Sequence, residues 1–485
     1  MFTVLQLTEL SYSPLITFVV GLLAVIALLV WLDLPAFIGL IIAAFFVGVV
    51  NSVFLPEFTT ADAATQVATA FGNGMAGIGI PILMAAVIGK SMLESGSAQR
   101  IVRGFQSLLG RDNSDIALLS SSTVLAVPVF FDSVFYLMAP LARSTRARLG
   151  RDYTLFIVVV GAGAAAAHVF VPPTPGPLAV ADEIGSNLGI TILIGLIVAI
   201  PAALVSGLLY GRWINARLDI PLRDTMSTTT EELESVAQKP TSALPGMGES
   251  LLPILLAVVL IASSTFVNTF VDAPSALGFI ADILGEATVE QILTTAQPYT
   301  DFVGDKNVAL TIAALAAAYT FYRYTGLTSS EWNDELTEAL KSGGNIAAIT
   351  AAGGAFGALL AASGIGDYIA GGLQELGIPL IVTAWLIAAI VRIAQGSATA
   401  AMLTAAGIMA PLTGQLAVHP AYLVMAIGAG GNICSWYNDS GFWLVKEIGG
   451  LTLGETLKTW TALTTLISVA GLLTVLAVST VMPLA

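Results

Sequence analysis

The stretch "AHVFVPPTPGP", residues 167 to 177, interrupts a chain that is apolar for dozens of residues on either side. Proline lacks a backbone N–H and clashes with the preceding helical turn, so a segment this rich in proline cannot continue a helix. At membrane depth, non-helical backbone is tolerated only inside protein or beside a water-filled cavity. The stretch therefore predicts a helix that is broken near the middle of a membrane, next to His168.

The composition around this stretch is that of an integral membrane protein. Of 485 residues, 56% are hydrophobic and 10% are charged, and apolar runs repeatedly reach the roughly 20 residues that a helix needs to cross a bilayer. One cysteine and two histidines make disulfide and zinc chemistry unexpected, so no cofactor and no metal are predicted. The net charge of -14 leaves no basic footprint for nucleic acid.

The fold class predicted from these runs is all-α and polytopic, with about 10 to 12 transmembrane helices. Ten apolar segments are long enough to cross, near residues 14–31, 36–55, 114–140, 153–170, 188–211, 251–268, 308–323, 378–411, 421–436 and 455–480. Two further stretches, 68–96 and 343–364, are dense in glycine and alanine and are predicted to be re-entrant hairpins. Tightly packed helices of small residues are the alternative for both stretches.

The distribution of lysine and arginine predicts the orientation. With residues 143–151 on the cytoplasmic side, twelve basic residues fall inside and four outside, which places both termini outside. The polar stretch 212–250 then becomes a cytoplasmic linker between an N-terminal half, 1–211, and a C-terminal half, 251–485.

The two halves share short motifs in the same order. The pairs are "LMAPL" at 137–141 with "IMAPL" at 408–412, "GKSMLESG" at 89–96 with "GALLAASG" at 357–364, and "EIGSNLG" at 183–189 with "EIGGLTLG" at 447–454. Their nearly constant offset favours an internal duplication. Five crossings per half would turn the second copy upside down, which is the inverted-repeat plan of secondary transporters, with substrate bound near mid-membrane.

Four ionisable residues fall within the membrane segments: Lys90, Asp132, His168 and Arg392. Such residues are costly and are functional candidates by default. Asp132 follows the helix-disrupting Pro128 and can bind a cation or carry a proton, with capping of a broken helix as the alternative. His168 titrates near neutral pH, although a structural hydrogen bond is equally open. Lys90 either has a functional role or snorkels from a hairpin end.

Arg392, in "WLIAAIVRIAQGSATAAM", is a candidate anion site. A guanidinium stays charged and can grip a carboxylate with two parallel hydrogen bonds. The alternative is an ion pair that joins two helices. Just downstream, "GSAT" supplies the hydroxyls of Ser397 and Thr399 and a glycine that loosens the helix.

A second predicted break lies in "ICSWYNDSGFWLVKE", residues 433–447. When the halves are aligned, "PPTPGP" falls against "NDSG". Asn438, Asp439 and Gly441 are therefore predicted to lie on an unwound segment that lines a cavity. Asp-Ser-Gly is also an ordinary turn sequence.

Together these stretches resemble the gluconate:proton symporter family, the gluconate permeases (GntP), within the ion-transporter superfamily. The motifs are "GKSMLESGSAQRIV", "FFDSVFYLMAPL", "HVFVPPTPGPLA", "RIAQGSATAAMLTAAGIMAPL" and "NDSGFWLVKE" followed by "LTLGETLKTW". The resemblance covers nearly the whole chain. It implies proton-coupled uptake of gluconate or similar sugar acids by two inverted repeats, each with a hairpin and a broken helix.

Several features depart from the pattern of gluconate carriers. Thr174 and Trp436 stand where those carriers often have histidine, and Asp132 stands where they often have glutamate. An extra polar stretch spans roughly 285–305. The absent histidines leave sodium coupling as the alternative to proton coupling.

The sequence thus predicts a multi-pass cell-membrane transporter that imports a small carboxylate, such as gluconate, by proton symport with alternating access. A membrane-embedded enzyme is the alternative of another class, but no H-E-x-x-H or G-x-S-x-G motif is present. The expected partners are the substrate and the lipid bilayer, with a homodimer left open. The predicted coupling residues are Asp132 and His168. The predicted substrate-binding residues are Arg392, Ser397, Thr399, Asn438, Asp439, Gly441 and Thr174.

Overall fold

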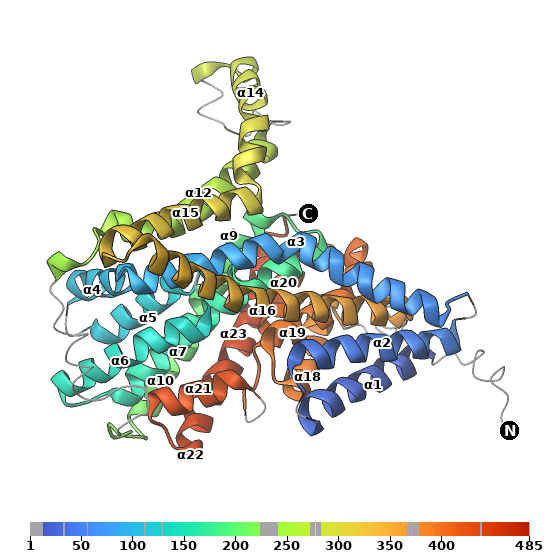
Figure 1. The fold of residues 1–485 in the computed structure, drawn as a ribbon, viewed down its shortest axis with the longest axis horizontal. Helices are drawn as coiled ribbons and strands as arrows, with labels where there is room; N and C mark the ends of the chain where they lie inside the picture. The colour runs from blue at the N-terminus through green and yellow to red at the C-terminus, as the bar shows by residue number, and fades with distance from the viewer. Residues whose placement is uncertain are drawn as a thin grey trace.

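The computed structural model of the chain is helical throughout its described part (Figure 1). It describes residues 13–484 except 33, 56, 111–112, 128–129, 224–240, 272–276, 278–282, 366–367, 369–377 and 437–438. The first half contains α1 (Ser13–Ile26), α2 (Ala36–Phe54), α3 (Thr60–Glu94), α4 (Ser97–Leu109), α5 (Ser114–Leu125), α6 (Phe131–Leu149), α7 (Tyr153–Phe170), α8 (Pro175–Ile184), α9 (Leu188–Ala203) and α10 (Tyr210–Asn215). The second half contains α12 (Met247–Phe270), α14 (Glu286–Gly304), α15 (Lys306–Thr325), α16 (Ser329–Ala362), α18 (Leu380–Gln395), α19 (Ala398–Met409), α20 (Pro420–Gly431), α21 (Ser440–Gly449), α22 (Leu453–Thr456) and α23 (Ala462–Val481).

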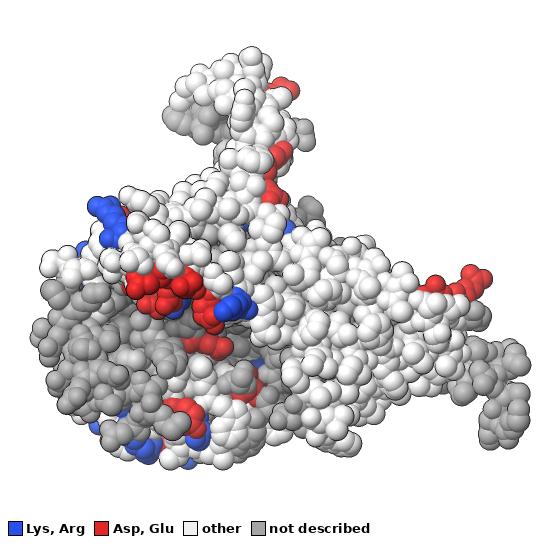
Figure 2. Space-filling view, viewed as in Figure 1, with Lys and Arg blue, Asp and Glu red and all other residues white. Residues whose placement is uncertain are grey.

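Seven helical segments of the described chain are long and apolar enough to cross a membrane, which confirms the predicted polytopic all-α class. They are 37–54, 60–94, 153–184, 188–215, 247–270, 329–362 and 453–481. Figure 2 shows a broad uncharged surface over the α1–α3 and α16 side of the molecule. There α2 exposes large apolar side chains that suit contact with lipid: Phe37, Ile38, Ile42, Phe45, Phe46, Val49 and Val53.

The two re-entrant hairpins predicted at 68–96 and 343–364 are wrong. Each stretch belongs to a single long helix, α3 or α16, and these two helices pack against each other. A β-carbon added at Gly74 would lie 3.2 Å from the Cα and Cβ atoms of Ala351, and one added at Gly343 would lie 2.8 Å from the Cβ atom of Ala86. The small residues therefore allow close approach of two helices, which was the alternative for these stretches.

Two predicted crossings are instead pairs of short helices. The segment 114–140 divides into α5 and α6, and the segment 378–411 divides into α18 and α19. The second pair is separated only by Gly396 and Ser397, and its helices pack against each other. Gly396 has φ +83°, a left-handed conformation that suits glycine and ends α18.

The breaks predicted at the two turn-rich motifs are confirmed. Helix α7 ends at Phe170 and α8 begins at Pro175, while α20 ends at Gly431 and α21 begins at Ser440. With the α5–α6 and α18–α19 turns, the described part of the chain has four places where apolar helices stop inside the protein. We call them the four interruptions.

The order of helices in the first half recurs in the second. The matching pairs are α3 with α16, α5 with α18, α6 with α19, α7 with α20, α8 with α21 and α9 with α22. The second helix of each pair begins about 265 to 269 residues after the first, close to the offset of the repeated motifs. This is the order that an internal duplication predicts.

The extra polar stretch near 285–305 forms α14, which stands out from the body with the end of α12 (Figure 1). The two helices are joined by polar contacts, since Asn268 Nδ2 donates to Asp301 Oδ1 at 2.7 Å and Gln297 Nε2 donates to Asn268 Oδ1 at 2.8 Å. Residues 224–240 of the predicted linker, 212–250, lie outside the described residues.

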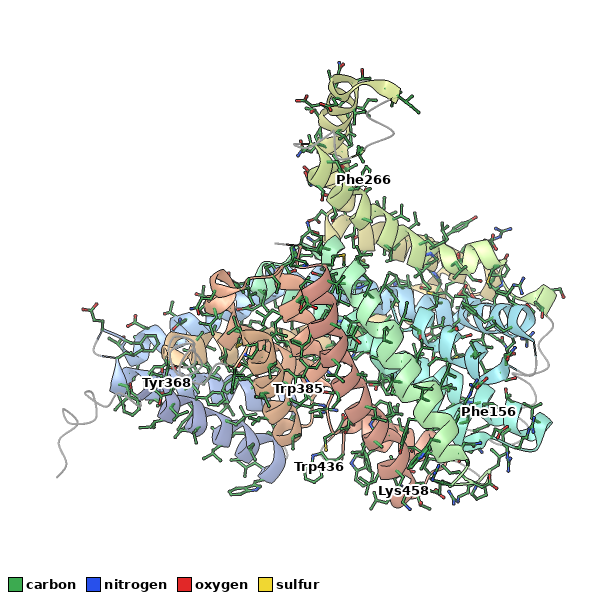
Figure 3. The ribbon with its side chains drawn as sticks, turned by 180° about the vertical axis from the view of Figure 1, so that it is seen from behind. Phe156, Phe266, Tyr368, Trp385, Trp436 and Lys458 are labelled. Atoms are coloured by element: carbon green, nitrogen blue, oxygen red, sulfur yellow. The ribbon has the colours of Figure 1, made fainter. Side chains whose placement is uncertain are left out.

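Helix α7 is almost wholly buried at the centre, and α20 crosses it closely. A β-carbon at Gly428 on α20 would lie 2.3 Å from the carbonyl oxygen of Val169 on α7. Helix α18 is joined to α23 by Trp385 (Figure 3), whose Nε1 donates to Ser468 Oγ at 2.9 Å. These contacts hold the interrupted helices in register.

We expect Gly428→Ala to lower the free energy of unfolding by about 1 to 3 kcal/mol, because the added methyl group meets backbone that cannot rotate away. The measurement is thermal unfolding of the detergent-solubilised protein. Gly354→Ala in α16 is the matched control, since a β-carbon there has no neighbour within 4 Å. Equal destabilisation by the two substitutions would contradict the proposed role of the crossing.

Candidate functional site

The four interruptions meet at one cavity of about 370 Å³, a size suited to a small molecule. Interrupted helices leave backbone groups unpaired inside the protein, where they can face a polar ligand. Polar and charged side chains reach the cavity from each interruption or its flanking helix. The lining residues are Leu29, Leu34, Phe130, Phe131, Asp132, Ala165, His168, Pro175, Ile346, Arg392, Gly396, Ser397, Ala398, Thr399, Asn432, Asp439, Gly441 and Trp460.

An ion pair between Arg392 and Asp439 lies at the cavity wall. Arg392 Nη2 is 2.5 Å from Asp439 Oδ2, and the Arg392 side chain is only 3% exposed. Within the described structure, Arg392 Nε and Nη1 are buried and have no hydrogen-bond partner. A guanidinium carries five N–H groups, and the pair with Asp439 uses only one of its three nitrogens. The other two nitrogens can therefore donate hydrogen bonds to a second carboxylate. The ion pair considered for Arg392 is thus present, and the anion site stays a prediction.

Two further hydrogen bonds hold the Asp439 carboxylate in place. It caps α21, since its Oδ1 accepts a hydrogen bond from the Gly441 amide at 3.0 Å. Its Oδ2 also accepts from the Ser435 hydroxyl, and Ser435 Oγ in turn accepts from Trp460 Nε1 at 2.5 Å. These donors fix the carboxylate beside Arg392 and orient Trp460 along the cavity.

The predicted hydroxyl residues lie where α19 begins. Ser397 caps this helix, because its side chain accepts from the Ala400 amide at 3.3 Å. Ser397 and Thr399 both line the cavity. The first turn of a helix presents unpaired N–H groups and a partial positive charge, which favour an anion.

The two predicted coupling residues line the same cavity. Asp132 lies in the first turn of α6, and its side chain is accessible to solvent. His168 lies in the last turn of α7, and its Nδ1 is buried without a hydrogen-bond partner in the described structure. Both titratable groups therefore share the cavity with Arg392, and their role in coupling stays a prediction.

Comparisons with known proteins give the family. The sequence profile of GntP family permeases matches residues 13–481. This chain belongs to the GntP permease family. It is similar to a gluconate permease of Pseudomonas aeruginosa, with 34% identity over 96% of this chain and 97% of the relative. The high-affinity gluconate transporter of Escherichia coli K12 is 32% identical, over 95% of this chain and 98% of its own.

A further relative and a solved structure are also similar to this chain. An L-idonate transporter of Escherichia coli K12 is 31% identical over 97% of this permease and the whole of its own chain. The crystal structure of the Alcanivorax borkumensis YdaH transporter has a TM-score of 0.57 and 15% identity, covering 88% of this chain and 90% of that one. The permease is therefore a multi-pass transporter of the cell membrane and not an enzyme, and it shares its helical fold with YdaH.

Three predicted site residues of the permease do not reach the cavity or are not described. Thr174 is 2% exposed, is absent from the cavity lining and donates its hydroxyl to the Val171 carbonyl at 2.7 Å. Lys90 is absent from the cavity lining; it pairs with Glu94 one turn along α3 at 2.9 Å and with Glu335 on α16 at 2.7 Å. Asn438 lies outside the described residues.

Among the cavity residues with hydrogen-bonding side chains, sequence reasoning missed Asn432 and Trp460. Asn432 is a lone amide that follows a glycine-rich apolar helix. Trp460 lies in the "LTLGETLKTW" motif, which supported the family resemblance, but no function was predicted for it. The isolated polar residue in a buried segment was a usable signal for Asn432. Trp436 (Figure 3) is near the same break and its Nε1 donates to the Ile393 carbonyl at 3.2 Å.

No cluster of three or more histidine, cysteine, aspartate or glutamate side chains that could hold a metal ion occurs in the part of the permease that the structure describes. Cys434 is a free thiol.

Proposed function

We propose that this permease imports gluconate or a related sugar acid by proton symport with alternating access. One observation carries the proposal: Arg392 is buried at the cavity, and two of its nitrogens find no hydrogen-bond partner among the residues that the structure describes. A monocarboxylate supplies the acceptors that these donors lack. The names of the relatives, gluconate and L-idonate transporters, support sugar acids as the substrate class.

The charge of the cavity supports cation coupling. Its described lining has one permanent cation, Arg392, and two carboxyl groups, Asp132 and Asp439. A substrate anion adds a further negative charge, and uncompensated charge away from water is costly. A proton carried with the substrate offsets that charge. Asp132 and His168 are the proposed carriers, because both line the cavity and both can bind a proton.

Alternating access is supported by the repeated order of helices and by the meeting of all four interruptions at one cavity. In inverted-repeat transporters, discontinuous helices bind the substrate between the repeats while one part of the protein moves against the other. We extend this plan to the permease, with halves at 1–211 and 251–485 in opposite orientations. A homodimer stays a prediction.

The test is uptake of labelled gluconate into proteoliposomes under imposed ion gradients. We expect saturable accumulation of unaltered gluconate when the lumen is alkaline, and loss of accumulation when a protonophore is added. Accumulation driven by a sodium gradient alone would replace proton coupling with sodium coupling. Absence of uptake under either gradient would reject gluconate as the substrate.

A further inference from the structure

Asn432 lines the cavity but has no part in the proposed binding of the carboxylate or in the proposed proton coupling. It follows the last residue of α20 and is 4% exposed. Its Nδ2 is buried and finds no hydrogen-bond partner within the described structure. Buried polar atoms are nearly always paired, so an unpaired amide that lines a cavity points to a ligand.

The position of Asn432 relates it to the anion site. Asn432 and Asp439 stand at the two ends of one interruption, the first after α20 and the second before α21. Asp439 is paired with Arg392, and Asn432, Asp439 and Arg392 all line the same cavity. A molecule whose carboxylate lies on Arg392 therefore extends into space that Asn432 borders.

The chemistry of the Asn432 amide indicates which group of the carried acid it would contact. A carboxamide is neutral and offers both a donor and an acceptor, whereas Arg392 offers donors only. A hydroxyl group is neutral and can also donate and accept, so it suits the amide in either orientation of its side chain. His168 Nδ1 is a second buried atom without a described partner in the same cavity. One charged contact and separate neutral contacts fit a polyhydroxy monocarboxylate.

We propose that Asn432 is a specificity-determining residue that recognises a hydroxyl group of the carried acid. The inference rests on the proposed function, since it takes a sugar acid as the substrate. It goes beyond that function by naming the residue that separates hydroxylated from non-hydroxylated acids. A site built to bond a hydroxyl group rejects the analogue that lacks it, because the protein's own polar atom is then left unpaired.

The experiment measures competition against labelled gluconate uptake in proteoliposomes. The competitors are gluconate, its deoxy analogues at each carbon in turn, and hexanoate. In the wild type, we expect one deoxy analogue to compete at least about tenfold more weakly than gluconate. In Asn432→Leu, the gap between gluconate and that same analogue should fall to within about threefold, while gluconate itself competes more weakly.

Asn51→Leu is the matched control. Asn51 is also buried, but its amide donates to the Leu359 carbonyl at 2.7 Å and it does not line the cavity. This substitution should reduce the amount of folded protein and leave every competition ratio unchanged. Asn432→Ser, which keeps a hydroxyl group in a shorter side chain, is the second variant and should retain part of the discrimination.

Three outcomes overturn the proposal. One is that, in the wild type, every deoxy analogue competes as strongly as gluconate. This outcome can be observed without any variant. Another is that Asn432→Leu weakens gluconate, the deoxy analogues and hexanoate by one common factor, which would mean that Asn432 acts on the carboxylate or on the fold. If the wild type takes up no gluconate under either ion gradient, the proposed function fails together with this inference, whereas uptake with unchanged ratios rejects the inference alone.

Discussion

Arg392→Gln is expected to lower gluconate uptake at subsaturating substrate by about 100-fold or more, because charge-assisted hydrogen bonds contribute about 1.5 to 3 kcal/mol each and two would be lost. Glutamine fills part of the same space but carries no charge. The loss should appear as a rise in the gluconate concentration needed for half-maximal uptake. The measurement is uptake into proteoliposomes, normalised to folded protein.

Arg143→Gln is the matched control for this substitution. Arg143 is 4% exposed, and its Nη2 donates to the Arg223 carbonyl at 2.6 Å, but it does not line the cavity. Its replacement removes a second buried arginine and should lower protein yield without changing the half-saturating concentration. Wild-type uptake by Arg392→Gln would end the anion-site proposal.

Asp439→Asn is expected to destabilise the empty permease by about 3 to 5 kcal/mol, because it leaves the buried Arg392 without its counter-charge. Asparagine has nearly the same shape and can still cap α21, so the change is mainly one of charge. Gluconate brings a new carboxylate to Arg392. It should therefore raise the unfolding temperature of Asp439→Asn by more than it raises that of the wild type.

The control is Asp115→Asn, which breaks the pair of Asp115 with Arg212. The two charged groups are 2.8 Å apart, and the Asp115 side chain is 10% exposed while the Arg212 side chain is 56% exposed. Because solvent reaches Arg212, this substitution leaves no buried arginine without a counter-charge, unlike Asp439→Asn. The loss of stability should be small and should not depend on gluconate. If gluconate stabilises Asp439→Asn no more than it stabilises the wild type, the carboxylate of the substrate does not occupy the place next to Arg392.

The broken helices were predictable because the signal is local. Four prolines in one stretch prevent α7 from continuing, because proline is tolerated only before a helix or in its first turn, where Pro175 and Pro177 begin α8. Asp439 of Asn-Asp-Ser-Gly caps the start of α21 in the same local way. Intramembrane charge was also a sufficient signal for Asp132, His168 and Arg392, since a residue that is costly in a membrane needs a reason to be there. These three meet at one cavity.

Intramembrane charge did not distinguish Lys90, which pairs away from the cavity, from the residues that line it. Glycine and alanine content did not distinguish a re-entrant hairpin from a long helix. Lys90 is compensated by Glu94 and Glu335, and the second of these is distant in sequence. Glycine and alanine permit both irregular backbone and close helix packing, so composition does not distinguish a hairpin from a crossing of α3 with α16. Only the facing helix decides between them.

By itself, the sequence determined the membrane class, the two breaks at its turn-rich motifs and the set of charged residues that had to be compensated. The tertiary structure decided which groups compensate one another: Asp439 with Arg392 across 47 positions of sequence, and Glu335 with Lys90. It also left Asn432 Nδ2 and two nitrogens of Arg392 without a hydrogen-bond partner among the described residues. Local conformation follows from neighbouring residues, whereas the pairing of buried polar groups depends on which helices pack together, and no stretch of sequence records that alone.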